Sequence, residues 1–350
     1  MRFIAGRRTK GVLMGCLVNL FLFLPTFLLF PLSEALAAQP GESSAQLVEG
    51  AKTEGKLVWY TTMTSGEAYE LLERFRGKYP FISTDVVKLS SEKVLQRILT
   101  ETQAKKYLFD VAATGAEGIL LKRKGILGRY ASPEMEFFPE GFKDPEGCWA
   151  DLYLNLNVIG YNTKLVSPKD APKAYADLLD PRWKGAIGMD NDGFEWMAGV
   201  IKAMGEEKGM EFMRNLSKQN IQVRPGRTLN AQLVVAGELS AALVYNNRVE
   251  ELKEKGAPID WTGLDLVIPE VHPIGMSAHA PHPNAAKLFI DYALSREGQQ
   301  VITSFYRISS RVDVDPKIPR LKKGLNITNP FFIDDYDKYT KLYRDLFMKK

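Results

Sequence analysis

Cysteine and histidine are scarce in this 350-residue sequence, which holds two cysteines and three histidines. Cys16 falls in the N-terminal leader described below, so the chain left after cleavage would keep Cys148 alone and could form no internal disulfide. His272, His279 and His282 have no established metal-ligand spacing. His272 and His282 each precede a proline, which predicts a turn or a helix start. We therefore expect neither a metal site nor a cofactor.

An excess of charge of one sign is also lacking. The whole chain carries 46 basic and 42 acidic residues, and four of the basic and one of the acidic residues lie in the first 37. The remainder has a formal charge of about +1, which gives no argument for binding nucleic acid or an anionic membrane. About 310 residues remain after the leader, enough to bury a large core and to form two domains.

The first 37 residues have the three parts of a secretory signal peptide. Four basic residues precede an apolar run over residues 12–32, and the tripeptide Ala35-Leu36-Ala37 follows it. This pattern predicts export and cleavage before Ala38. A retained membrane anchor is one alternative, because the run could span a bilayer. A lipoprotein is another, because residues 13–16 (LMGC) resemble a lipobox. No second apolar run approaches membrane length.

The rest of the chain alternates short strand patterns with helix patterns. Residues 56–60 (KLVWY) read as a strand, and the apolar residues of 68–75 recur at helical spacing. Residues 110–113 read as a further strand before a helix. The middle of the chain repeats this order, with strands at 156–161 and 186–189. Such alternation indicates an α/β fold with ligand-binding loops at the carboxyl ends of the strands.

Four phrases resemble those of extracellular solute-binding proteins of ABC importers. They occur in order at residues 178–185 (LLDPRWKG), 236–238 (AGE), 256–258 (GAP) and 280–291 (APHPNAAKLFID). The resemblance runs from about residue 56 to residue 311 and is closest to the ferric-ion-binding and small-solute branch. Within the first phrase, we expect Trp183 to pack in the core and Gly185 to turn the chain.

The resemblance implies a two-lobed α/β fold of the type II periplasmic-binding class. It implies two mixed sheets flanked by helices, with the ligand between the lobes, and crossover strands near 152–157 and 260–275. We assign residues 1–37 to the signal peptide, and 38–152 with 275–350 to lobe 1, including a C-terminal helix docked by its aromatics. Residues 153–274 form lobe 2 with the hinge crossovers. A permease in the inner membrane would recognise the form that has closed around the ligand.

Ferric relatives in this branch typically use a tandem tyrosine pair, because phenolate oxygens suit Fe(III). Alignment on the Gly-Glu phrase puts Asn247 and Arg248 at that pair. Residues 61–64 stand where a histidine is common, and residues 114–115 where an acidic ligand is common. Tyr245 could be a single ligand, two residues early. The sequence therefore disfavours iron, which stays as the alternative cargo.

The residues found instead suit an organic anion, such as a carboxylate or a phosphonate. Hydroxyl-bearing or arginine-containing loops precede three predicted helices, whose starts offer backbone N–H groups and partial positive charge. Arg227 or Arg248 could add two parallel hydrogen bonds. The candidate ligand-binding residues are Thr61, Thr62, Thr64, Ser91, Thr114, Gly115, Asn155, Asp190, Arg227, Thr228, Tyr245, Asn247 and Arg248.

The acidic loop at residues 190–196 leaves a choice open. If Asp190 or Asp192 faces the cleft, the solute would also carry an ammonium group. The alternative, which we prefer from sequence, is that Asp192 caps a helix together with Glu195 three residues later.

Other classes of protein are less well supported. No nucleophile motif and no phosphate-binding glycine loop occurs, so we expect no enzymatic activity. We expect a monomer that binds a small solute and works with an ABC permease. A ligand-binding component of a sensor system has the same sequence features and stays as a further alternative.

Overall fold

A computed structural model describes residues 44–115, 117–328 and 336–349 of the chain. The strands are β1 Lys56–Thr61, β2 Ser83–Lys88, β3 Val111–Ala113, β4 Ala150–Asn162, β5 Ile187–Asp190, β6 Gln222–Arg224, β7 Ala241–Tyr245, β8 Ile259–Thr262 and β9 Pro269–Met276. The helices are α1 Ser44–Glu54, α2 Ser65–Lys78, α3 Ser91–Gln103, α4 Glu117–Arg123, α5 Phe194–Met204, α6 Glu206–Ser217, α7 Arg227–Ala236, α8 Asn246–Glu254, α9 Pro283–Leu294, α10 Arg296–Ser304 and α11 Tyr336–Tyr343. Shorter helical turns are η1 Pro133–Phe137, η2 Tyr175–Leu179, η3 Pro181–Trp183, η4 Pro319–Leu321 and η5 Arg344–Met348.

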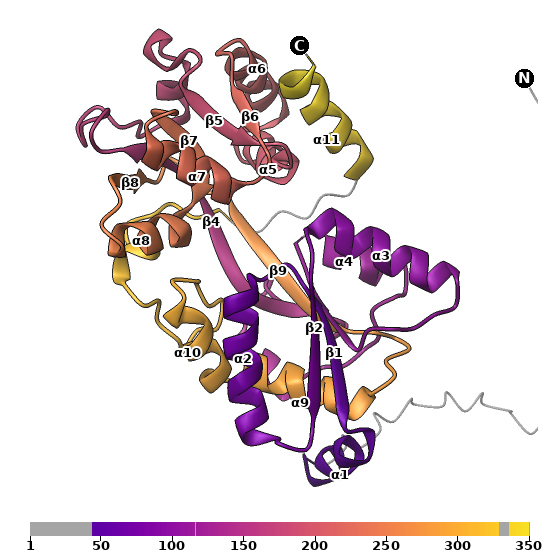
Figure 1. Ribbon diagram of the computed structural model, residues 1–350. Coiled ribbons are helices and arrows are strands. Elements are labelled where there is room, and N and C mark those ends of the chain that lie inside the picture. Colours follow the sequence, from indigo (N-terminus) through magenta and orange to yellow (C-terminus); the bar gives the residue numbers. More distant parts are fainter. Residues whose placement is uncertain (1–43, 116, 329–335, 350) are drawn as a thin grey trace, which may run out of the picture. The chain divides into compact units, whose positions relative to one another are not determined.

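The first group of elements is a parallel α/β layer. Strand β1 pairs in parallel with β2 on one side and with β3 on the other. Helix α2 turns Ala68, Leu71, Leu72 and Phe75 inward, and all four are buried with α9 and α1 against the sheet. Helix α3 buries Val94 and Ile98 in a separate cluster with Tyr60 and Phe109. Helices thus cover the sheet on both faces, which leaves the strand ends for a ligand (Figure 1).

The second group repeats this arrangement around β5. Strand β5 pairs in parallel with β6 and with β7. Helices α5 and α6 bury their apolar sides with β5, and α7 packs with β7 in another cluster. Trp183 is buried in the first of these clusters and Gly185 has a positive φ of 76°, as expected from the Trp-Lys-Gly phrase.

Strands β4 and β9 connect the two groups. They run antiparallel to each other, and β9 also pairs with β3 while β4 also pairs with β7 and β8. All 13 residues of β4 are buried, as expected for a strand covered on both faces. The two predicted mixed sheets therefore form one hydrogen-bonded series, β2-β1-β3-β9-β4-β7-β5-β6. The predicted crossovers fall on these two strands, although Asp260 belongs to β8.

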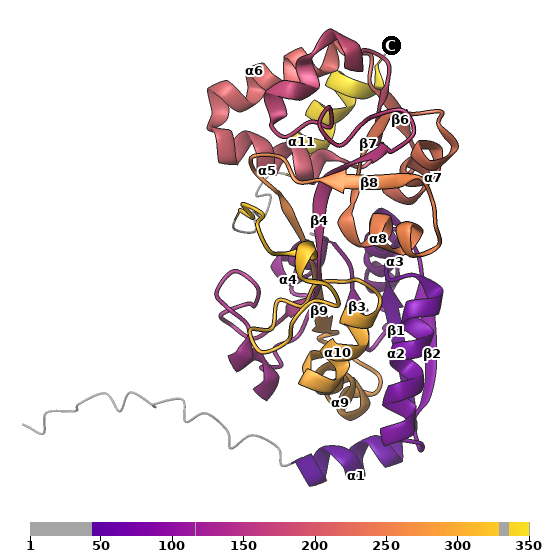
Figure 2. The same ribbon diagram turned by 90° about the vertical axis from the view of Figure 1, so that its left-hand side faces the viewer.

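The C-terminal helix is docked by its aromatic residues, as the sequence predicts. Tyr343 and Phe347 are buried in the cluster that contains Phe194 and Trp196 of α5. Tyr336 packs edge-on against Phe194, with ring centroids 4.8 Å apart. The lobe boundaries stay a prediction; the helix itself lies against α5, which belongs to the segment 153–274 (Figure 2).

The predicted leader, residues 1–37, lies outside the described residues. Within residues 44–115, 117–328 and 336–349, none of the helices has the length and apolar character needed to cross a bilayer.

Candidate ligand-binding site

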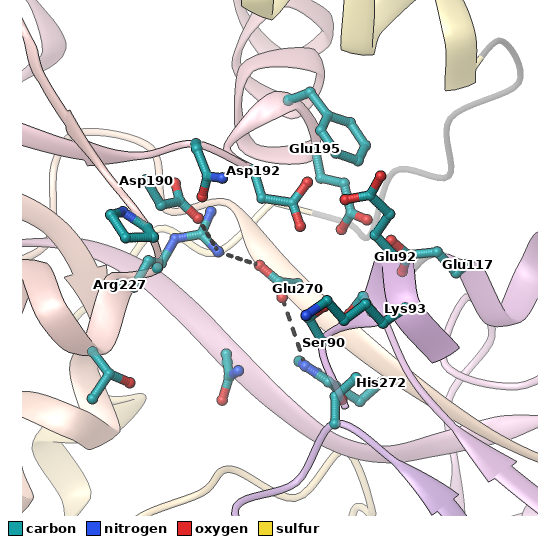
Figure 3. Close-up of a pocket in the computed structure, with 18 of the residues that line it drawn as sticks. Ser90, Glu92, Lys93, Glu117, Asp190, Asp192, Glu195, Arg227, Glu270 and His272 are labelled. Carbon is teal, nitrogen blue, oxygen red and sulfur yellow. Dashed lines mark hydrogen bonds and ion pairs between the residues drawn. The ribbon is translucent and has the colours of Figure 1, made fainter. Parts of the chain in front are cut away.

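A cavity of about 770 Å³ lies where the ends of strands from both groups meet. The loops that follow β1, β2, β5, β6 and β7 contribute to its wall. Strands β4 and β9, which connect the two groups, contribute to it as well. Figure 3 shows part of this wall. The volume suits a small organic molecule, since ligand sites commonly enclose about 300–1,000 Å³.

Five helices begin at this cavity without a side-chain cap. The N-cap residues are Thr64 of α2, Ser90 of α3, Gly193 of α5, Gly226 of α7 and Tyr245 of α8, and in this part of the described chain none accepts a capping hydrogen bond. The first turn of an uncapped helix keeps free N–H donors and partial positive charge. The wall is therefore rich in backbone donors aimed at the ligand space.

Arg227 is the central buried cation. Its Nη1 donates to Glu270 Oε2 at 3.0 Å and to the Tyr245 hydroxyl, and it lies 3.5 Å from Asp190 Oδ2. The guanidinium also stacks on the Tyr245 ring, 4.6 Å from its centroid. Only 7% of Arg227 is exposed, yet Nε and Nη2 find no hydrogen-bond partner among the described residues. One edge of the guanidinium is thus left for an acceptor.

Gly226 explains how Arg227 reaches the cavity. Its φ of +87° lies in the left-handed region that favours glycine. This turn ends β6 and starts α7 within two residues, so that Arg227 points back toward β9 and β7 rather than into solvent.

A second basic group stands beside the first. Arg307 donates to Asn155 Oδ1 at 2.7 Å and to Glu67 Oε2 at 2.8 Å. Its guanidinium lies 4.2 Å from the centroid of the Tyr153 ring, and His272 stacks on the same ring at 4.1 Å. Burial lowers the pKa of His272 to about 4, so the imidazole is neutral near pH 7. Arg307, Tyr153 and His272 thus form a stacked group that lines the cavity beside Glu270.

Three carboxylates gather on the other side of the cavity. Glu117 is 1% exposed and its Oε2 has no hydrogen-bond partner among the described residues. Loss of hydration and the charge of Asp192 raise the pKa of Glu117 to about 8. Asp192 is an exposed residue at the rim, and partial dehydration with the charge of Asp190 raises its pKa to about 6. Burial and the neighbouring Glu117 raise the pKa of Glu195 well above its ordinary value.

The C-terminal helix closes the same side of the cavity. The Tyr336 hydroxyl donates to Glu117 Oε1 at 3.3 Å, and the Tyr343 hydroxyl donates to the backbone oxygen of Asp190 at 2.5 Å. Both tyrosines line the cavity, together with Thr340 and Arg344. Because α11 hydrogen-bonds with α4 and with the end of β5, it links the two groups across the site.

The structure brings most of the predicted site residues together. Ten of them line the cavity: Thr62, Thr64, Ser91, Asn155, Asp190, Arg227, Thr228, Tyr245, Asn247 and Arg248. Three do not line it. Thr61 is fully buried and its Oγ1 accepts from Met63 N–H at 3.1 Å, while Thr114 is fully buried behind the wall. Gly115 lies behind the wall close to Glu117 and Ser91.

Two interpretations from sequence are wrong. Asp192 does not cap α5, because the N-cap is Gly193 and lacks a side-chain cap; Asp192 and Glu195 line the cavity instead. His272 is not in a turn, because it lies within β9 and is stacked on Tyr153. His282 is the N-cap residue of α9 with Pro283 after it, as predicted.

Sequence reasoning also missed several residues of the wall. They are Tyr153, Glu117, Glu270, Arg307, Tyr336 and Tyr343. Glu117 follows Thr114 closely, and Glu270 alternates with His272 along an extended segment, so both had a local signal. Arg307 and the tyrosines of α11 had none, because they come to the cavity from distant positions in the chain.

Within the described residues, no three side chains among histidine, cysteine, aspartate and glutamate are placed to hold a metal ion. Tyr245 donates to Glu270 Oε1 at 2.7 Å, and burial raises its pKa well above its ordinary value, so the phenol stays protonated.

Comparison with known proteins agrees with this geometry. A family model described as bacterial extracellular solute-binding protein matches residues 118–341. The chain belongs to this family. An uncharacterized protein of Haemophilus influenzae is 25% identical over 275 residues, 72% of this chain and 76% of that protein.

Solved structures confirm the fold. The periplasmic binding protein AfuA of Actinobacillus pleuropneumoniae, with fructose-6-phosphate bound, superposes with a TM-score of 0.75 at 21% identity, covering 85% of this chain and 99% of AfuA. Iron-bound HitA of Pseudomonas aeruginosa gives a TM-score of 0.74 at 24% identity, covering 83% and 99%. The chain therefore has the two-lobed type II periplasmic-binding fold, as predicted.

Proposed function

We propose that this family member is the solute-binding subunit of an ABC importer and that it captures a small organic solute through an anionic group. In this proposal the chain is exported by a cleaved signal peptide, works as a monomer in the periplasm, carries out no catalysis, and delivers its solute to an inner-membrane permease. A carboxylate, a phosphonate or a phosphate has the required acceptor oxygens.

The observation that carries the proposal is the unused edge of Arg227 among uncapped helix starts. Nε and Nη2 of a guanidinium form a planar pair of donors that matches two oxygens of an anion. Both atoms are buried and find no partner among the residues that the structure describes, an arrangement that costs free energy unless a ligand completes it. The N-terminus of α7, at Arg227 and Thr228, adds backbone donors beside the same group. The phosphate-bearing ligand of the structural neighbour AfuA is consistent with an anion in such a site.

Ferric iron is the second candidate cargo. It is favoured by four tyrosines that line the cavity, Tyr153, Tyr245, Tyr336 and Tyr343, and by the iron-bound structural neighbour HitA. It is disfavoured because Asn247 and Arg248 occupy the expected positions of the tyrosine pair. Burial also raises the pKa of Tyr245 and Tyr343 well above the ordinary value, which opposes phenolate formation.

The test is ligand binding by the purified protein and by an Arg227→Lys variant. Lysine keeps one charge but cannot present two parallel donors. We expect carboxylates or phosphonates to raise the melting temperature of the wild type, and Arg227→Lys to weaken that binding at least about tenfold. Arg296→Lys, at an exposed position on α10, is the control and should bind as the wild type does.

Two results would contradict the proposal. Stabilisation by Fe(III)-citrate with a tyrosinate charge-transfer band, and by no metal-free anion, would establish iron as the cargo. Equal anion affinity in Arg227→Lys and the wild type would remove Arg227 from the site.

A further inference from the structure

The acidic and basic side chains around the cavity are paired unevenly. Three arginines of the wall have a carboxylate partner: Arg227 has Glu270 at 3.0 Å, Arg307 has Glu67 at 2.8 Å, and Arg248 has Glu251. Glu117, Asp192 and Glu195 have no such partner, since among residues 44–115, 117–328 and 336–349 no basic side chain pairs with any of them. The acidic groups of the wall that no basic side chain contacts are therefore gathered on one side of the cavity.

Two of these carboxyl groups, those of Glu117 and Glu195, come close to one place. A side chain added at Gly115 would put its Cβ 3.0 Å from Glu117 Oε2 and 3.7 Å from Glu195 Oε1. Burial raises the pKa of Glu117 and of Glu195, and the charge of Asp192 raises both further, as does Glu117 that of Glu195. In Figure 3, Glu117 and Glu195 lie on the side of the pocket opposite Arg227, with Glu270 between them.

Two buried side chains that line this pocket, one basic and one acidic, leave hydrogen-bonding atoms unpaired among the described residues. Arg227 is 7% exposed with Nε and Nη2 unpaired, and Glu117 is 1% exposed with Oε2 unpaired, within the described part of the chain. A solute with an anionic group alone would leave the carboxylates uncompensated. A solute with a cationic group alone would leave Arg227 and the uncapped helix starts unsatisfied.

We infer that the solute is zwitterionic, with its anionic group on Arg227 and an ammonium group held by Glu117, Asp192 and Glu195. This inference rests on the proposed function and names the substrate class of the same site. The Tyr336 ring, packed edge-on against Phe194 with centroids 4.8 Å apart, adds an aromatic surface beside the carboxylates. Aromatic rings with carboxylates are a favourable surrounding for an alkylammonium group.

The experiment compares three matched series of probes by thermal shift and calorimetry. The first is linear ω-amino acids of three to six carbons, the second is the carboxylates that lack the amine, and the third is the alkylamines that lack the carboxylate. We expect at least one ω-amino acid to bind at least tenfold more tightly than both of its halves.

Substitution of the carboxylates tests whether they bind the ammonium group. Glu117→Gln and, at the exposed rim, Asp192→Asn should each weaken amino-acid binding at least tenfold and should not weaken binding of the plain carboxylate, which loses a repelling acidic group. If Glu117→Gln disturbs folding, Asp192→Asn still tests the inference, because Asp192 is exposed. Glu211→Gln, an exposed carboxylate on α6 that lines no part of the cavity, is the control.

The outcomes separate this inference from the proposed function. If plain carboxylates bind as tightly as amino acids, the zwitterion is excluded and the anion-binding function stands. If alkylamines alone bind, the solute is a cation and both are wrong. If no ω-amino acid stabilises the protein at millimolar concentration, the inference is overturned, and the anion panel with Arg227→Lys decides the proposed function separately.

Discussion

Arg227 and Glu117 are buried ionisable residues of one cavity wall, and each has hydrogen-bonding atoms without a partner in the described part of the chain. Each unpaired buried group costs about 1–3 kcal/mol relative to a satisfied one. Proteins keep such groups chiefly where function requires them. At the scale of single residues, these unpaired groups make the folded chain less stable while the cavity is empty. The folded chain gains stability when a complementary ligand binds.

Glu117 gives a pH-dependent prediction. Its pKa rises from 4.5 to about 8 in the folded chain because of burial and the charge of Asp192, with Glu195, Glu270 and Tyr336 around it. The folded state therefore holds this proton more tightly than the unfolded state between these two pKa values. The free energy of unfolding should fall as pH rises through this window, by on the order of a few kcal/mol.

Chemical denaturation of the ligand-free protein measures this pH dependence of the free energy of unfolding. Glu117→Gln should be more stable than the wild type at pH 8.5 and close to it at pH 4.5, while Glu211→Gln should follow the wild type at both. A Glu117→Gln variant that loses stability equally at both pH values would show that Glu117 has a structural role instead.

At the scale of elements, the starts of helices decide where the ligand binds. Helices α2, α3, α5, α7 and α8 all begin at the cavity because each follows a strand whose carboxyl end lies there. Helix α11 is different, since it follows no strand directly and reaches the cavity by packing on α5. It contributes Tyr336 and Tyr343 to a wall that strand-to-helix loops otherwise build.

The role of α11 can be measured with Tyr343→Phe. This change removes the hydroxyl that donates to the Asp190 carbonyl at 2.5 Å, so that this buried oxygen loses one hydrogen bond. We expect the free energy of unfolding to fall by about 1–2 kcal/mol and solute affinity to fall with it, because the end of β5 is no longer held. Tyr339→Phe in the same helix, outside the cavity wall, should change neither; equal effects of the two variants would contradict a specific role for Tyr343.

At the scale of the whole molecule, β9 pairs with the first group through β3, β4 pairs with the second group through β7, and in the described chain the sheet joins the two groups where β4 and β9 pair with each other. Bending of these two strands is therefore the route by which the groups could close on a solute, as binding proteins of this fold do. The cavity contains residues from both groups, so a bound solute would bridge them.

Small-angle scattering tests closure. Adding a solute that stabilises the wild type should lower its radius of gyration, because differential contacts favour the closed state. The same addition should leave Arg227→Lys unchanged at a concentration too low for it to bind. A radius that stays constant in saturated wild type would show that the solute enters without closure.

The sequence by itself determined the α/β alternation, the family resemblance and the region of ten of the thirteen named site residues, because these depend on local periodicity and on loops that follow strands. It could not tell whether Asp192 caps a helix or faces a ligand, since both fit the same spacing. Only the tertiary structure decided this, and only it brought Glu117, Arg307 and Tyr336 to one cavity. Their arrangement depends on distances between residues far apart in the chain, and that arrangement, rather than any motif, is the basis for inferring a zwitterion in place of the expected anion.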